Sequence, residues 1–237
     1  MKKFLLLLTL SLLPKVICAQ SIFDMLGQKD YPAMEKKLSE GDNPNKQNKD
    51  GINALFRASF DGDTTAVKIL LKYGADINFE SEPNQLTALI AASQSGHVEI
   101  AKILIKAGAN VNAKDIHGWS ALRTATRNGR MDIIELLVNN NATIDDKATD
   151  GATPMMMAAY KGHQEIVEYL LSKGANINSL AKDKETALTY AAQAGRKNVV
   201  ELLLKNGADK NQVTEEGKTA LSLAVENGFP DIASILK

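Results

Sequence analysis

The side chains best suited to chemistry in this sequence include three histidines. His97, His117 and His163 could act as acid–base catalysts or metal ligands if a nucleophile or further ligands lay nearby. His97 and His163 each follow a glycine, at a recurring place that holds Arg130 and Arg196 elsewhere. A place that takes either histidine or arginine is typical of a turn residue, so we predict no metal site and no histidine catalysis.

The other reactive groups form no catalytic set either. Cys18 is the single cysteine, and no Ser–His pair or glycine-rich phosphate loop occurs in context. Glu165 and Glu168 fall on the polar stripe of an expected helix, where carboxylates are solvated. Glu80 and Glu82 lie in an irregular stretch, residues 80–86, without a base or nucleophile beside them. We therefore predict no enzyme activity and no cofactor; an enzyme would need a polar pocket at this irregularity.

The first nineteen residues carry an export pattern. Lys2 and Lys3 precede an apolar run, Phe4 to Leu13, and Ala19 ends the segment. This order predicts a signal peptide, residues 1–19, cleaved after Ala19. A membrane anchor is the alternative, but a run of about ten residues is short against the roughly 20 that span a bilayer. Lipid modification of Cys18 is a second alternative, which the residues before it match poorly.

Export and composition narrow the partners and the compartment. The chain has 28 basic and 28 acidic residues, and cleavage would leave 25 bases against 28 acids, a net charge of about −3. Because no cluster of Lys and Arg gives a basic domain, we expect no nucleic-acid partner. The short signal resembles bacterial ones, so we expect a periplasmic or extracellular protein. Without a cysteine in the mature chain, packing alone must stabilise it.

The rest of the chain repeats itself. KGHQEIVEYLLSKGANIN, residues 161–178, nearly copies SGHVEIAKILIKAGANVN, residues 95–112. Three columns of small residues recur, the first with a spacing of 34 and then four of 33. They are Gly62, Gly96, Gly129, Gly162, Gly195 and Gly228; Ala58, Ala92, Ala125, Ala158, Ala191 and Ala224; and Gly41, Gly74, Gly108, Asn141, Gly174 and Gly207.

Each column has a physical meaning. The third follows an apolar helical run, so it marks helix ends in the left-handed conformation that Gly adopts freely and Asn tolerates. The alanines lie within helices, where a small side chain lets the next helix approach. A capping residue stands five positions before each alanine: Asn53, Thr87, Ser120, Thr153, Thr186 and Thr219. Each unit is therefore expected to form two helices, and a second helix with only one polar stripe requires neighbours on both sides.

This pattern resembles the ankyrin repeat, as in DGATPMMMAAYKGHQEIVEYLLSKGANIN, residues 150–178. The resemblance implies an all-α repeat solenoid, with helix-turn-helix units joined by β-hairpin loops. A degenerate capping repeat, residues 20–47, would precede an ankyrin-repeat domain at 48–237. Its six units would be 48–80, 81–114, 115–147, 148–180, 181–213 and 214–237.

Two departures from the family pattern affect the expected contacts. The helix-opening histidine of the family is replaced in every unit, by Phe56, Ile90, Arg123, Met156, Thr189 and Ser222. We therefore expect looser linkage between units. The second unit has an extra residue around 81–86 and no Asp-Gly turn, so its hairpin should be irregular.

By the same resemblance, function should lie on the concave face, which binds other proteins in this family. We expect Trp119, Arg127 and Tyr160 to form a cluster there. These residue types dominate binding hot spots, so the cluster would be the centre of the contact. The alternative is that Trp119 only leans on the adjacent hairpin and Tyr160 only covers its own helix end. The predicted partner-binding residues are Asp50, Ile52, Phe60, Leu86, Gln94, Ile116, His117, Trp119, Arg127, Tyr160 and Lys161.

We thus predict an exported, monomeric, non-catalytic module that binds a protein partner on its concave face. The alternative function is a dedicated inhibitor, immunity protein or protective factor for one toxin or envelope enzyme. Such a protein should have a single tight partner, whereas a general scaffold should have several.

Overall fold

The computed structural model describes residues 20–237, so the predicted signal peptide lies outside the described residues. The described chain contains 14 helices, arranged as seven successive pairs, and its only β-structure is two isolated bridges. The pairs are α1 (Ile22–Gln28) with α2 (Tyr31–Ser39), α3 (Ala54–Asp61) with α4 (Thr64–Lys72), α5 (Ala88–Ser95) with α6 (Val98–Lys106), α7 (Ala121–Arg127) with α8 (Met131–Asn139), α9 (Pro154–Lys161) with α10 (Gln164–Ser172), α11 (Ala187–Gln193) with α12 (Lys197–Lys205), and α13 (Ala220–Glu226) with α14 (Pro230–Leu236).

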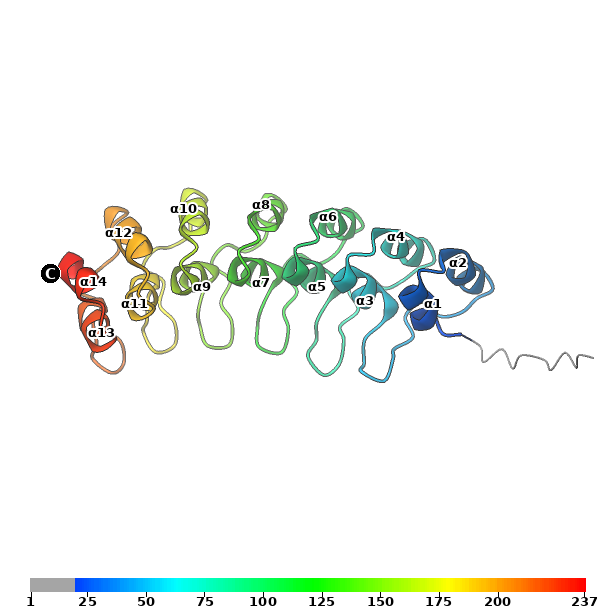
Figure 1. The fold of residues 1–237 in the computed structure, drawn as a ribbon, viewed down its shortest axis with the longest axis horizontal. Helices are drawn as coiled ribbons and strands as arrows, with labels where there is room; N and C mark the ends of the chain where they lie inside the picture. The colour runs from blue at the N-terminus through cyan, green and yellow to red at the C-terminus, as the bar shows by residue number, and fades with distance from the viewer. Residues whose placement is uncertain (1–19) are drawn as a thin grey trace, which may run out of the picture.

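The helix pairs stack side by side into one elongated array (Figure 1). The odd-numbered helices form an inner row and the even-numbered helices an outer row, and the loops between pairs project beyond the inner row. The array arches gently, with the outer row on its convex side and the loop tips on its concave side. The predicted all-α repeat solenoid is confirmed.

The inner helices begin where the capping residues predict. In α3, α5, α7, α9, α11 and α13 the side-chain oxygen of the residue before the helix accepts a hydrogen bond from the N–H three positions on, at 2.8–3.4 Å. The caps are Asn53, Thr87, Ser120, Thr153, Thr186 and Thr219. A cap of this kind satisfies one N–H that the first turn of a helix leaves unpaired.

The glycine between the two helices of a unit has two reasons to be glycine. Gly62 has a φ of +81°, a conformation that costs an L-residue energy. In addition, a Cβ on Gly62 would lie 2.6 Å from the imidazole of His97 in the next unit. Gly195 is covered in the same way by the Phe229 ring, at 2.6 Å. The column is thus fixed both by its own backbone and by the neighbouring unit.

The hydrophobic core runs the length of the array and has no single centre. The alanine column is fully buried where successive inner helices pack against each other. The outer helices each bury an apolar pair, such as Val67 with Leu70 and Ile134 with Leu137. Full burial of such a side chain contributes about 1.5–3 kcal/mol relative to exposure, so most of the stabilisation comes from contacts between neighbouring units.

Two rows of hydrogen bonds also join each unit to the next. Along the loop tips, the backbone N–H groups of Glu82, Ile116, Thr149, Lys182 and Glu215 donate to the carbonyls of Gly51, Asn84, His117, Asp150 and Asp183, at 2.8–3.2 Å. Just after the outer helices, side-chain oxygens of Asn45, Asn78, Asn112, Asp145 and Asn178 accept from the N–H groups of Asp76, Asn110, Thr143, Asn176 and Asp209. The rows hold the loop tips in register.

The two departures from the family pattern have different outcomes. The second hairpin is irregular, as expected: Ser81 pairs with Leu86 across a four-residue loop in which Gln85 takes the positive φ. The expectation of looser linkage is wrong at Arg123, because its guanidinium donates to the carbonyl of Ala152 in the next unit at 2.5 Å. A charged donor therefore replaces the absent histidine at this interface.

Candidate partner-binding groove

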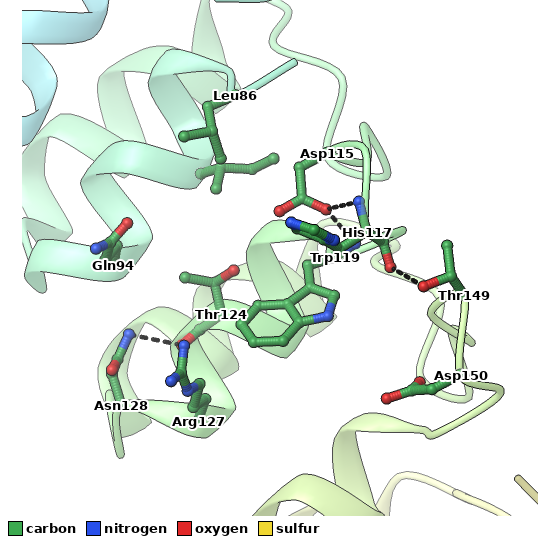
Figure 2. A pocket seen from close by; sticks show the side chains of 11 residues that line it. Leu86, Gln94, Asp115, His117, Trp119, Thr124, Arg127, Asn128, Thr149 and Asp150 are labelled. Carbon is green, nitrogen blue, oxygen red and sulfur yellow. Dashed lines mark hydrogen bonds between the residues drawn. The ribbon is translucent and has the colours of Figure 1, made fainter. Parts of the chain in front are cut away.

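Five of the eleven predicted binding residues meet in one groove on the concave side. Leu86, Gln94, His117, Trp119 and Arg127 line a groove of about 530 Å³ between the second, third and fourth units. Figure 2 shows Leu86 on one side and Trp119 with Arg127 on the other. The groove is completed by residues that were not among the predicted binding residues: Ile90, Asp115, Thr124, Asn128, Thr149 and Asp150.

The other six predicted residues lie outside this groove. Phe60, Ile116 and Tyr160 are large side chains with 41%, 44% and 41% of their surface exposed. Asp50 and Lys161 are exposed and Ile52 is half-buried. Tyr160 does not join Trp119 in the predicted cluster: its ring stands edge-on to Tyr190, with 6.2 Å between centroids. The concave side therefore carries two aromatic sites.

Trp119 lies within contact distance of two guanidinium groups. The Cζ atoms of Arg123 and Arg127 lie 5.0 and 4.9 Å from the centroid of the indole ring. Both distances are within the range of cation–π contact, which contributes about 0.5–2 kcal/mol depending on desolvation. Since Arg123 and Arg127 are one turn apart in α7, the helix itself positions the pair. The ring is thus positioned as part of the groove wall.

Arg123 is the main residue that the sequence-based prediction missed. Its side chain is 1% exposed, and it forms two hydrogen bonds to the carboxylate of Asp150, at 3.2 and 3.4 Å. The Asp150 side chain is 56% exposed. A signal existed, because Arg123 occupies the column in which the family places a hydrogen-bonding histidine. The pair joins the third unit to the fourth directly beneath Trp119.

The loop that precedes α7, between Lys114 and Ser120, orients the other groove residues. Asp115 Oδ1 accepts from the backbone N–H groups of His117 and Trp119, both at 2.8 Å. The His117 ring is exposed and lies 6.5 Å from the Trp119 ring between centroids. The His117 carbonyl accepts hydrogen bonds from Thr149 of the next loop. Figure 2 shows these contacts converging at the rim of the groove. The loop is therefore pre-organised before any partner arrives.

The second aromatic site is set in an acidic environment. Burial, reinforced by the neighbouring carboxylates of Glu185, Asp183 and Asp150, raises the pKa of the Tyr190 phenol well above its usual range. Burial also raises the pKa of the Glu185 carboxyl, and Asp183 adds to the increase. Both groups are therefore more readily found uncharged than in free peptide.

Neither a metal-binding cluster nor a membrane-spanning helix is found within residues 20–237. No three His, Cys, Asp or Glu side chains in this range are placed to hold a metal ion together. The two histidines of the turn column instead face the carbonyls of the preceding unit, His97 that of Phe60 at 3.1 Å and His163 that of Arg127 at 3.4 Å. None of the helices described is long and apolar enough to cross a bilayer.

Comparison with known proteins agrees with this architecture. No curated protein matches the chain. A family description, "Ankyrin repeats (3 copies)", matches residues 25–115, 114–181 and 174–237, which together cover nearly all of the described chain. Ankyrin repeats are protein–protein interaction modules and are generally non-catalytic. With its glycine and alanine columns, capped inner helices and projecting loops, the chain belongs to the ankyrin-repeat family.

Proposed function

We propose that this protein binds a protein partner through its concave face, with the Trp119 groove as the centre of the contact. The observation that carries the proposal is the half-buried Trp119 ring, which lies within cation–π distance of Arg123 and Arg127 on the wall of an open groove. Trp and Arg are enriched at binding hot spots because they desolvate a large area while losing little conformational entropy. Because the groove side chains are already ordered, less conformational entropy is lost on binding.

Binding to the concave face can be tested with a photo-crosslinking residue in the mature chain, residues 20–237. A crosslinker at His117 should trap a partner from the source cell, whereas the same crosslinker at Lys102, on the outer helix α6, should trap none. The double variant Trp119→Ala, Arg127→Ala should abolish the His117 product without changing the helix content. Equal products at His117 and Lys102 would refute a specific concave site.

The identity and number of trapped proteins separate the two forms of this function. One dominant partner, held tightly, would support a dedicated inhibitor or protective factor. Several partners of similar yield would support a scaffold.

We also propose that the protein is exported, on the evidence of the basic start, apolar run and Ala19 of the N-terminal segment. Mass spectrometry of the protein from its own cell should find Gln20 as the first residue. A chain that retains Met1 or begins at any other residue would contradict this proposal.

A further inference from the structure

We infer that the Trp119 groove accepts an extended peptide segment in which a carboxylate side chain lies next to a bulky apolar side chain. This inference rests on the proposed function and specifies the chemistry of the partner. It is carried by the charge left unpaired in the groove, by its apolar wall and by the backbone groups that are already in use.

The groove lining offers one guanidinium without a partner among the described residues, whereas its two carboxylates are already hydrogen-bonded. Asp115 is engaged by two backbone N–H groups, and Asp150 is engaged by the Arg123 guanidinium and by the N–H of Ala152 at 2.9 Å. Arg127, by contrast, is exposed and forms no ion pair or side-chain hydrogen bond with any of residues 20–237. Its N–H groups remain free for an incoming carboxylate, the acceptor that guanidinium groups match best.

The wall beside Arg127 is apolar. Leu86 is half-buried, Ile90 is buried, and the half-buried Trp119 ring lies across from Leu86. An apolar side chain placed between Leu86 and Trp119 would remove these surfaces from water. A carboxylate on the adjoining residue would then meet Arg127 in a partly desolvated place, where a charged hydrogen bond is stronger than in open water.

Two backbone N–H groups of the loops beside the groove are not free to pair with an added strand. The N–H of Ile116 donates to Asn84 and the N–H of Thr149 donates to His117, so these groups already join one loop to the next. An extended segment must instead be held by side chains. Gln94 is exposed and its side chain forms no hydrogen bond within the described chain, so its amide can pair with a peptide backbone.

The same features argue against a polyanion. Nucleic-acid sites use rows of Lys and Arg, whereas this groove has one unpaired cation beside two carboxylates. Its volume of about 530 Å³ is within the roughly 300–1,000 Å³ of small-ligand pockets, which suits a few side chains of a segment.

The groove contains its own reporter, because Trp119 is the single tryptophan of the chain. The mature chain can be titrated with acetylated, amidated hexapeptide pools whose central pair is Glu-Leu, Gln-Leu, Lys-Leu or Glu-Ala, while tryptophan fluorescence is recorded. We expect the Glu-Leu pool to bind about tenfold more tightly than the Gln-Leu pool, the usual effect of one charged hydrogen bond. The Lys-Leu and Glu-Ala pools should bind more weakly still.

Two variants assign the preference to one side chain. Arg127→Gln should bring the Glu-Leu pool to the affinity of the Gln-Leu pool and leave the latter unchanged. Arg57→Gln is the matched control: it removes the same charge from α3, where Arg57 pairs with Asp61 outside the groove, and it should keep the tenfold preference. Circular dichroism checks that both variants keep the helix content.

Several results would overturn the inference. They are equal affinities for the Glu-Leu, Gln-Leu and Lys-Leu pools, no fluorescence response to any pool, and competition by an oligonucleotide at the same site. If His117 still traps a protein partner in any of these cases, the concave-face function stands and only its peptide chemistry is wrong. If His117 traps nothing, both fail.

Discussion

The Arg123–Asp150 pair yields the most specific stability prediction. Asp150→Asn removes the negative charge from a guanidinium that is 1% exposed, while the carbonyl of Ala152 still accepts from it. Breaking a fully buried pair costs about 3–5 kcal/mol and an exposed pair under about 1 kcal/mol. Because the Asp150 side chain is 56% exposed, we expect Asp150→Asn to lower the free energy of unfolding by about 2 kcal/mol.

A second variant tests whether the buried charge itself is the cause. In Arg123→Met, Asp150→Asn no charge remains to be desolvated, and methionine can fill the space of the arginine stem. The double variant should therefore be more stable than Asp150→Asn alone, although Ala152 loses a donor. Urea unfolding, followed in parallel by circular dichroism and by Trp119 fluorescence, measures both variants. A loss below about 0.5 kcal/mol for Asp150→Asn, or a double variant less stable than the single one, would refute the reasoning.

Three further predictions concern the loops. Gly174→Ala should lower the free energy of unfolding by about 1–2 kcal/mol because φ is positive there, and Gly151→Ala should lower it more because its Cβ would also lie 2.7 Å from the N atom of Lys182. Thermal unfolding compares the two variants, and equal losses would contradict the packing argument. Lys184→Gly should raise stability by about 1 kcal/mol because Lys184 has a φ of +61°, and an unchanged melting temperature would count against this. Glu185→Gln should stabilise the protein at neutral pH, because a raised carboxyl pKa means that the folded state disfavours the charged form. The gain in stability should shrink as the pH falls through that pKa and vanish below the ordinary value of 4.5, and a gain that is constant with pH would disprove the prediction.

The scaffold could be predicted from the sequence because its key positions have few chemical solutions. The column after the outer helices has a positive φ at every position, which suits glycine and then asparagine best, and Asn141 indeed has a φ of +65°. Only a small residue such as Ala125 fits between two inner helices in contact. These demands are local and recur in every unit, so each column carries the information several times.

The groove could be predicted only in part because it depends on contacts between units. Trp119 and Arg127 belong to one unit, and their meeting follows from helix geometry. Arg123 pairs with residues of the next unit. The sequence shows only that an arginine replaces the family's helix-opening histidine, and not which residue it contacts. Tyr160 was expected beside Trp119, yet the stacking offset brings it to Tyr190 of the following unit. Side-chain partners across an interface need the three-dimensional offset between units.

The two rows of hydrogen bonds that join the loops have a mechanical consequence. Every one of these bonds connects a unit only to its direct neighbour, so a pull along the long axis loads all interfaces in series. All interfaces should then carry the same force, and the array should open at the force that separates its least stable interface. The Arg123–Asp150 ion pair strengthens the interface between the third and fourth units, so we expect the array to open first at another interface.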